Sequence, residues 1–335
     1  MSLITEIHIP ESPWKMDYSH KTMFIGSCFT ENIGQKMIDL KFDVDMNPFG
    51  ILYNPESIAN SLQILLEKRA FFEYDLFQDQ GLWNSFYHHS RFSDTEPAAI
   101  LEKINSRIVS SHEFLKNADF LVITFGTAWA YELLNSGQIV SNCHKVPAAQ
   151  FSRVRLGVHE ITEAYRSLME ELWAFNPKLK IIFTVSPIRH WKDGAVENQV
   201  SKAILLLAID RLKTGFGDRA CGYFPAYELM MDELRDYRFY AEDMLHLSPF
   251  AIDYIFERFS KAMISKESMQ VSQNVLKIQK AVQHRPANPT SGEYKKFLEV
   301  NLKEISKLES DFPYLDFTQE KNHFERELAG FQHVK

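Results

Sequence analysis

The sequence predicts an α/β protein in which a parallel β-sheet is covered by helices on both faces. Three short runs of apolar, often β-branched residues have the composition of buried strands, at positions 23–25, 120–125 and 181–185. Amphipathic segments separate these runs and repeat apolar residues at helical spacing. Strands that alternate with helices in this way form βαβ units, whose parallel strands lie in one sheet.

The elements follow in chain order from this pattern. The strand at 23–25 ends in a Gly26–Ser27 turn, and a helix at 30–40 follows with its apolar residues on one face. The strand at 120–125 (Phe-Leu-Val-Ile-Thr-Phe) precedes a helix at 160–175. The strand at 181–185 (Ile-Ile-Phe-Thr-Val) precedes a helix at 195–212. Each predicted strand is therefore followed by a helix that can return the chain to the start of the next strand.

The C-terminal third has a different character. Ser248 and Pro249 are a good N-cap and a good first helical residue, and apolar residues then repeat at helical spacing up to Met263. Beyond about residue 265 the sequence becomes polar, passes the breaker at 285–289 and resumes a charged helical pattern. We therefore expect a main domain at 1–265 and a helical extension at 266–335.

Composition limits the classes of function. The 335 residues are 45% hydrophobic and 24% charged, as in ordinary soluble proteins. The net charge is −7 and the basic residues are dispersed, so we expect no nucleic-acid partner. No secretory signal and no run long enough to span a bilayer is readable, so we expect no membrane association. The three cysteines are widely spaced and have no metal-ligand spacing, which favours reduced thiols and a cytoplasmic location.

The turn after the first strand is a candidate catalytic position. Ser27 lies at the carboxyl end of a strand and at the start of a helix, where free N–H groups and the helix dipole favour a developing oxyanion. Most Gly-Ser turns are only turns, so this interpretation requires a base elsewhere in the chain. Cys28 is a rival nucleophile, because a thiolate at a helix N-terminus is activated. Its alternative interpretation is a small buried hydrophobic residue.

Asp243 and His246 are the candidate base pair. Three residues apart on a tight turn, the carboxylate can accept from one ring nitrogen and leave the other free as a base. The alternative is a surface aspartate beside a histidine that caps the turn. A serine after the first strand and an Asp-x-x-His before a late helix is, however, the chain order of the SGNH hydrolases.

Other polar residues have open interpretations. Arg189 and His190 follow a strand end and either bind a substrate or brace Glu197 and Asp243. Asn198 lies on a helix opposite its apolar stripe and is either solvated or part of a site. Trp129 is either a stacking wall for a sugar or an acyl group, or a core residue. For the adjacent histidines at 88–89 a role in packing or hydrogen bonding is favoured over a metal site, because no third metal-binding residue lies at a spacing typical of such a site.

The string Gly26-Ser27-Cys28-Phe29 resembles the signature of the GSCFA-domain family, which is grouped with SGNH-type esterases. Further blocks between about residues 20 and 260 also resemble this family, and they lie at 47–55, 123–129, 142–145, 186–190, 197–202, 223–228 and 243–246. Nothing in the resemblance extends to the C-terminal helices. It implies a three-layer α/β/α sandwich of flavodoxin-like type.

The resemblance also implies a catalytic triad with Ser27 as nucleophile, His246 as base and Asp243 as its orienting carboxylate. Oxyanion donors in SGNH enzymes come from a glycine in the second block and an asparagine in the third. Gly50 can supply the first, and Asn47 lies in the same block. The third block reads Gly126-Thr127-Ala128-Trp129 and lacks the asparagine. The substitutes within reach are Thr127, a backbone N–H, Asn142 and His144.

We therefore expect a serine esterase that hydrolyses a small O-acyl ester, such as an acetyl group on a carbohydrate, and that needs no cofactor or metal. The expected partner is this small-molecule or carbohydrate ester. Two alternatives remain open from the sequence: acyl transfer to another alcohol by the same triad, and a catalytically silent module that binds a carbohydrate or a partner. The sequence does not indicate an oligomeric state.

Overall fold

A five-stranded parallel sheet forms the centre of the computed structural model, which describes residues 5–217, 219 and 221–331. The strands lie in the order β10–β9–β5–β1–β2, so along the chain the order is 2-1-3-4-5, that of a flavodoxin-like fold. Their bounds are Lys21–Gly26 (β1), Asp43–Met46 (β2), Phe120–Phe125 (β5), Lys180–Val185 (β9) and Cys221–Tyr223 (β10). The predicted α/β class with a parallel sheet is confirmed.

The three predicted strands are β1, β5 and β9, and β5 has the predicted bounds. The two edge strands were missed. Strand β2 begins Asp-Val-Asp, which breaks the apolar run that a buried parallel strand shows, and β10 has only three residues. Both edge strands follow a predicted strand and its helix, so the βαβ pattern rather than their own composition is the signal for them.

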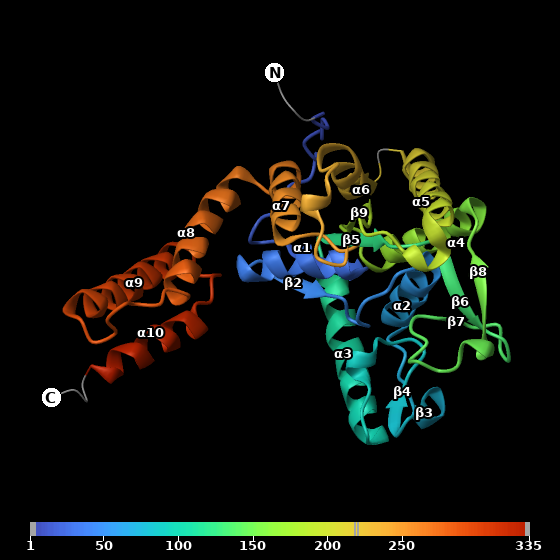
Figure 1. The fold of residues 1–335 in the computed structure, drawn as a ribbon, viewed down its shortest axis with the longest axis horizontal. Coiled ribbons are helices and arrows are strands. Elements are labelled where there is room, and N and C mark those ends of the chain that lie inside the picture. The colour runs from blue at the N-terminus through green and yellow to red at the C-terminus, as the bar shows by residue number, and fades with distance from the viewer. Residues whose placement is uncertain (1–4, 218, 220, 332–335) are drawn as a thin grey trace.

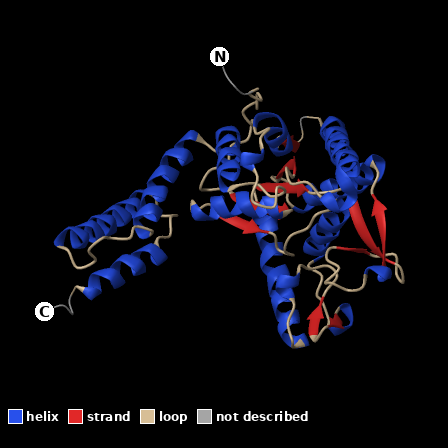
Figure 2. Cartoon of the chain, in the orientation of Figure 1, coloured by secondary structure: helices blue, strands red, loops and turns tan. Residues whose placement is uncertain are grey.

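Helices cover both faces of the sheet (Figures 1 and 2). Successive strand residues point to opposite faces, so Met23 and Ile25 pack in one core and Phe24 packs in the other. The first core receives four helices: α2 (Pro55–Glu67), α3 (Pro97–Asn117), α4 (Val158–Phe175) and α5 (Gly194–Phe216). The second receives α1 (Cys28–Asp39), the short α6 (Ala226–Glu228) and α7 (Pro249–Met263).

The predicted helices correspond to α1, α4, α5 and α7. Ser248 caps α7 as expected, with its hydroxyl accepting from the N–H of Ala251 at 3.3 Å. Helix α1 begins two residues earlier than predicted, at Cys28, with Ser27 as the N-cap residue. The nucleophile candidates at 27 and 28 therefore both belong to the start of this helix.

Two antiparallel insertions were not predicted. The hairpin of β3 (Phe77–Asp79) and β4 (Leu82–Asn84) precedes α3. A second sheet, in the order β7–β6–β8, follows directly after β5 and consists of β6 (Trp129–Leu133), β7 (Ile139–Val140) and β8 (Phe151–Arg155). This second sheet brings aromatic and basic side chains to the carboxyl end of the central strands.

The C-terminal extension is helical as expected, with α8 (Lys266–Val282), α9 (Gly292–Asp311) and α10 (Thr318–Gly330) extending from α7 to one side of the sheet domain (Figure 1). The hydroxyl of Tyr18 ties the two parts together, because it donates to the carbonyl of Leu40 at 2.9 Å and pairs with Ser272 at 3.0 Å. None of the described helices combines the length and the apolar character needed to cross a bilayer.

The turn after β1 depends on a glycine at position 26. Gly26 has φ +142°, and a Cβ there would lie 2.3 Å from the carbonyl oxygen of Thr124 on β5. Its N–H donates to the side-chain oxygen of Asn47 at 2.9 Å, and its carbonyl accepts from Leu52 at 2.9 Å. The two hydrogen bonds hold the end of β1 against the loop after β2, and Gly26 also pairs with Thr124 of β5, so these contacts set the position of the first turn of α1.

We expect Gly26→Ala to destabilise the fold by about 2 kcal/mol or more, because the backbone conformation is strained for alanine and β5 must move. Gly215→Ala is the matched control, since Gly215 lies in α5, a Cβ there would meet no atom within 4 Å, and alanine favours a helix by about 1 kcal/mol. Denaturant unfolding measures both changes. Equal stability of the two variants would contradict this account of the turn.

Candidate active site

A pocket of about 400 Å³ lies at the carboxyl ends of the central strands. Three of its lining segments directly follow a strand: Cys28 after β1, Thr127 after β5, and 188–190 after β9. The chain order reverses between β1 and β5, and in open α/β sheets ligands bind in the crevice at this point. The pocket is therefore where the fold favours a ligand.

The pocket includes part of the predicted set. Among its lining residues are the predicted Thr127, Asn142, Arg189, His190 and His246, together with Cys28 and Trp129. The other candidates are not among the lining residues, and they are Ser27, Asn47, Gly50, His144, Asn198 and Asp243. Three of these outer residues, His144, Asn198 and Asp243, form a hydrogen bond with a lining residue.

Asp243 and His246 form a hydrogen-bonded pair at the pocket mouth. His246 Nδ1 lies 2.5 Å from Asp243 Oδ2, and the other carboxylate oxygen accepts from the N–H groups of Leu245 and His246, each at 2.9 Å. These hydrogen bonds, with the imidazole bond the strongest, lower the pKa of Asp243 to about 2. An ionised carboxylate only accepts, so Nδ1 carries the proton and Nε2 is free to act as a base.

Ser27 and Cys28 differ in their access to this pocket. Ser27 is only 1% exposed, is absent from the pocket lining, and its hydroxyl has no hydrogen-bond partner among the described residues. Cys28, the first residue of α1, is partly exposed and lines the pocket with His246. Cys28, and not Ser27, is therefore the residue of this pair that borders the space in which a substrate would be bound.

The environment of Cys28 includes stabilising groups for a thiolate. Burial raises the pKa of the Cys28 thiol, while the N–H groups of Cys28 and Phe29 at the helix start and the ammonium of Lys202 act in the opposite direction. Because burial dominates, the thiol is protonated at neutral pH. Nucleophilic attack by Cys28 therefore requires a base to take its proton.

Two of the expected oxyanion donors are already engaged. The N–H of Gly50 donates to the carbonyl of Asn47 at 2.8 Å, and the N–H of Thr127 donates to the carbonyl of Tyr53 at 2.9 Å. The geometry thus does not support Gly50 as a donor. Thr127 retains its hydroxyl, which pairs with that of Ser201 at 3.0 Å. The N–H groups at the start of α1 are the donors that best fit this task.

Three other predicted residues shape the loops around the pocket. Asn142 accepts the N–H of His144 at 2.8 Å through its side-chain oxygen, and its amide nitrogen is left to donate to a ligand. His144 lies outside the pocket lining and binds the carbonyl of Ser85 at 2.8 Å through Nε2. Asn198, buried on α5, accepts from the N–H of His190 at 2.9 Å and so fixes the loop after β9.

Lys202 is fully buried below the pocket and was not singled out by sequence reasoning as a key residue. Its ammonium donates to the carbonyls of Gly126 at 2.6 Å and Ser186 at 2.7 Å, which follow β5 and β9. Burial lowers the pKa of Lys202 to about 7. The sequence had placed Lys202 with Asn198 on the side of the helix opposite its apolar stripe, as either a solvated or a site-lining residue, and the structure shows that it is buried.

His190 is a second group of the pocket whose pKa is shifted. Burial, with charge from Lys202, Arg153 and His246, lowers the pKa of His190 to about 4, so this imidazole is neutral.

The unpredicted second sheet supplies the remaining wall. Trp129 and Tyr131 from β6 and Arg153 from β8 line the pocket, and the Arg153 guanidinium lies 5.2 Å from the Trp129 ring centre and 4.4 Å from that of Tyr131. Trp129 is thus part of the pocket wall. Arg153 was missed because its strand, Phe-Ser-Arg-Val-Arg, has only five residues and no regular alternation of polar and apolar side chains.

The adjacent histidines have a packing role. His88 is fully buried and stacks on Phe49, with ring centres 4.8 Å apart. Burial lowers its pKa to about 3, so it is neutral. Within the described ranges, no group of three or more His, Cys, Asp and Glu side chains has an arrangement suited to a metal ion.

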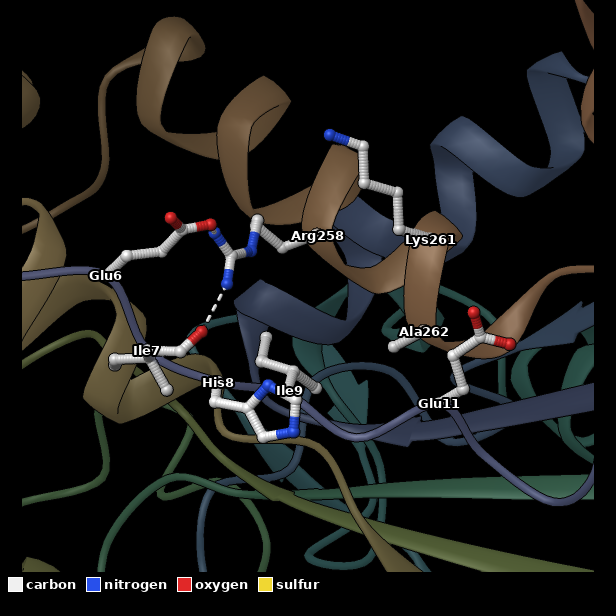
Figure 3. A pocket seen from close by; sticks show the side chains of 8 residues that line it. All are labelled: Glu6, Ile7, His8, Ile9, Glu11, Arg258, Lys261 and Ala262. Atoms are coloured by element: carbon white, nitrogen blue, oxygen red, sulfur yellow. Dashed lines mark hydrogen bonds and ion pairs between the residues drawn. The ribbon is translucent and has the colours of Figure 1, made fainter.

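A second hollow, of about 460 Å³, lies between the N-terminal segment and α7 (Figure 3). Its lining residues are Glu6, Ile7, His8, Ile9, Glu11, Arg258, Lys261 and Ala262. Arg258 spans it and donates to the carboxylate of Glu6 at 3.0 Å and to the carbonyl of Ile7. These groups fasten the N-terminal segment to α7, and the lining contains neither a thiol nor a hydroxyl nucleophile.

Comparison with known protein families gives two matches. The GSCFA family matches residues 21–259, which include every lining residue of the strand-end pocket. This chain belongs to the GSCFA family. The C-terminal domain described for GSCFA domain proteins matches residues 275–330, within the helices α8 to α10.

Among solved structures, the chain is similar to an acetyl xylan esterase (Est2A) from the rumen bacterium Butyrivibrio proteoclasticus. The sequence identity is 12%, the TM-score is 0.35, and the match covers 72% of this chain and 64% of the esterase. At this distance the comparison carries no weight for the chemistry. No curated protein matches the sequence.

The buried ammonium of Lys202 predicts a pH-dependent stability for this GSCFA protein. Its pKa is 10.5 in the unfolded chain and about 7 in the folded state, so above about pH 7 the unfolded chain binds a proton that the folded chain has lost. Stability from this group therefore increases as pH rises from about 7, by up to about 1.4 kcal/mol per pH unit.

We expect Lys202→Met to lose this gain, so that its free energy of unfolding falls relative to the wild type between about pH 7 and 8.5. Lys213→Met, an exposed position on the same helix, is the control and should follow the wild type. Denaturant unfolding at several pH values measures the slopes. Parallel curves for wild type and Lys202→Met would contradict a depressed pKa.

Proposed function

We propose that the protein hydrolyses a small O-acyl ester through a covalent acyl-enzyme, with Cys28 as nucleophile, His246 as base and Asp243 as the orienting carboxylate. The observation that carries this proposal is that Cys28 and His246 line the same pocket at the start of α1, while the Ser27 hydroxyl is buried outside its lining. The Asp243 contact leaves Nε2 of the imidazole free for proton transfer.

The first step acylates the enzyme. Nε2 of His246 takes the proton from the Cys28 thiol as the sulfur attacks the ester carbonyl carbon, and the carbonyl oxygen becomes an oxyanion. The N–H groups at the start of α1 lie where they can stabilise that charge. The tetrahedral centre then collapses: the ester C–O bond breaks, a thioester remains on Cys28, and the imidazolium gives its proton to the leaving alcohol.

The second step regenerates the thiol. A water molecule attacks the thioester carbonyl while Nε2 takes one of its protons, and the C–S bond breaks as sulfur recovers that proton. The products are a carboxylic acid and the free enzyme. An alcohol in place of water would make the same enzyme an acyltransferase, and the chemistry of the first step is unchanged.

The size and walls of the pocket support a small substrate. About 400 Å³ is within the range of pockets for single small molecules. Trp129 and Tyr131 give the wall an aromatic surface beside which a sugar ring or an apolar acyl group can lie, while cationic side chains contact their rings. An acetyl or similar short acyl ester of a carbohydrate is therefore the substrate that we propose.

The triad with Ser27 as nucleophile is the second candidate. Ser27 is the N-cap residue of α1, and no hydrogen bond within the described chain fixes its hydroxyl in an inward position. A local change of conformation at Ser27 would be needed to bring its hydroxyl into the pocket, because the residue is only 1% exposed and lies outside the lining. This candidate therefore requires a rearrangement that Cys28 does not.

Single substitutions separate the two nucleophiles, with 4-nitrophenyl acetate as the substrate. We expect Cys28→Ala to lower kcat by at least about 10³-fold and His246→Ala by about 10² to 10⁴-fold. Ser27→Ala should keep most of the activity. Cys221→Ala, at a thiol on the edge strand β10 outside the pocket lining, is the matched control and should keep the wild-type rate.

The opposite pattern, with activity lost in Ser27→Ala and kept in Cys28→Ala, would establish the serine triad instead. A folded wild-type protein that neither turns over nor becomes acylated by a panel of short-chain esters would refute the hydrolase proposal. Product analysis with an added alcohol acceptor separates hydrolysis from acyl transfer.

A further inference from the structure

The pocket concentrates positive charge in a protein whose net charge is −7. Its lining contains three permanently basic side chains, Arg153, Arg189 and Lys192, and one carboxylate, Asp193. Arg153 is paired with Asp193. Two basic groups of the lining therefore remain without a carboxylate partner among the described residues, and the buried Lys202 lies below them.

Arg189 is the least satisfied of these groups. Its Nε atom is buried without a hydrogen-bond partner in the described part of the chain, and a terminal nitrogen meets only the sulfur of Met231, at 3.4 Å. Sulfur in a thioether is a weak acceptor. A partly buried guanidinium normally pairs with an anion, because its desolvation is otherwise uncompensated. The second terminal nitrogen forms no hydrogen bond within the described residues and is not among the buried unsatisfied atoms, so a carboxylate in the pocket would supply an acceptor for it.

Lys192 extends the positive region to the pocket mouth. It lies in the 3₁₀ turn after His190, is exposed, and donates to the hydroxyl of Tyr131. Its ammonium is 4.8 Å from the centre of that ring. Within the described chain it forms no ion pair, so it can attract an anionic ligand as it enters.

The other titratable groups around the pocket agree with a positive potential. Lys192 and Arg153 favour the ionised form of the Cys143 thiol, although burial raises its pKa. Lys202, Arg153 and His246 all add to the effect of burial in lowering the pKa of His190.

We propose that the pocket selects esters that carry a carboxylate, with Arg189 as the main partner of that group and Lys192 as an auxiliary cation at the mouth. This inference rests on the proposed function and specifies its substrate class. A neutral ester leaves the Arg189 guanidinium unpaired, whereas a carboxylate pairs with it through charge-assisted hydrogen bonds. The anion is on either the acyl or the alcohol part, since both parts occupy the pocket in the first step.

The test compares kcat/KM for two esters with the same leaving group, neutral 4-nitrophenyl butyrate and anionic 4-nitrophenyl hemisuccinate. A second pair, phenyl acetate and 4-acetoxybenzoate, places the carboxylate on the alcohol. We expect the wild type to prefer the anionic member of at least one pair by about 10-fold or more. The preference should decrease as salt is added, because exposed charges such as Lys192 are screened.

Arg189→Gln should remove most of this preference by raising KM for the anionic ester more than KM for the neutral one. Arg189→Lys should restore part of it. Arg166→Gln, at an exposed position on α4 paired with Glu163, is the matched control and should behave as the wild type. Melting temperatures establish that each variant is folded.

The possible failures are distinguishable. Hydrolysis with equal kcat/KM for neutral and anionic esters, unchanged in Arg189→Gln, refutes carboxylate selection and leaves the hydrolase proposal intact. If the wild type hydrolyses neither ester, calorimetric titration with monomethyl succinate decides the matter. Binding that Arg189→Gln weakens at least 10-fold supports the anion site without catalysis, and absence of binding refutes it.

Discussion

The buried ammonium of Lys202 joins the two chain segments that lie beneath the pocket. It donates to the carbonyl of Gly126 after β5 and to that of Ser186 after β9, and so fixes the relative position of two chain segments that leave the sheet in parallel. A buried cation with no carboxylate partner in the described chain is costly, and its depressed pKa reflects that cost. Its position below Cys28 also contributes positive charge where a thiolate or an oxyanion would form.

The other site groups are arranged around these segments by the topology of the sheet. The reversal of strand order between β1 and β5 opens the crevice, and the glycine turn at Gly26 brings the start of α1 to its edge. His246 arrives from the far end of the domain on a turn that Asp243 closes through its contacts with Leu245 and His246. The nucleophile candidate and the base thus come from opposite ends of the domain, and neither segment alone forms a site.

Much of the fold was readable because buried parallel strands and amphipathic helices leave strong periodic patterns. Strand β5 and the cap of α7 at Ser248 were predicted to the residue. The Asp243–His246 contact also agrees with the spacing argument. The pattern fails for β2 and β10, which are short and lack continuous apolar runs. It also fails for the second sheet, whose strands are short and do not alternate polar and apolar residues regularly.

The choice between Ser27 and Cys28 was not readable from the motif, because one residue of register decides which residue lines the pocket. Helix α1 starts at Cys28, not at Thr30; Cys28 lines the pocket, whereas Ser27 is buried outside its lining. The engagement of the Gly50 N–H by Asn47 likewise depends on a loop conformation that composition does not specify. The contacts of Lys202 and Arg189 could not be predicted either, because they join segments that are far apart in the sequence.

The chemical nature of the acyl adduct tests the central claim most directly. The protein would be mixed with an acetyl ester labelled with ¹³C at the carbonyl, quenched in acid, and studied by ¹³C NMR and peptide mapping. We predict a thioester carbonyl resonance, carried by the peptide that contains Cys28 and absent in Cys28→Ala. An oxyester resonance on that peptide, or a thioester on Cys143, would contradict the assignment of Cys28 as the nucleophile.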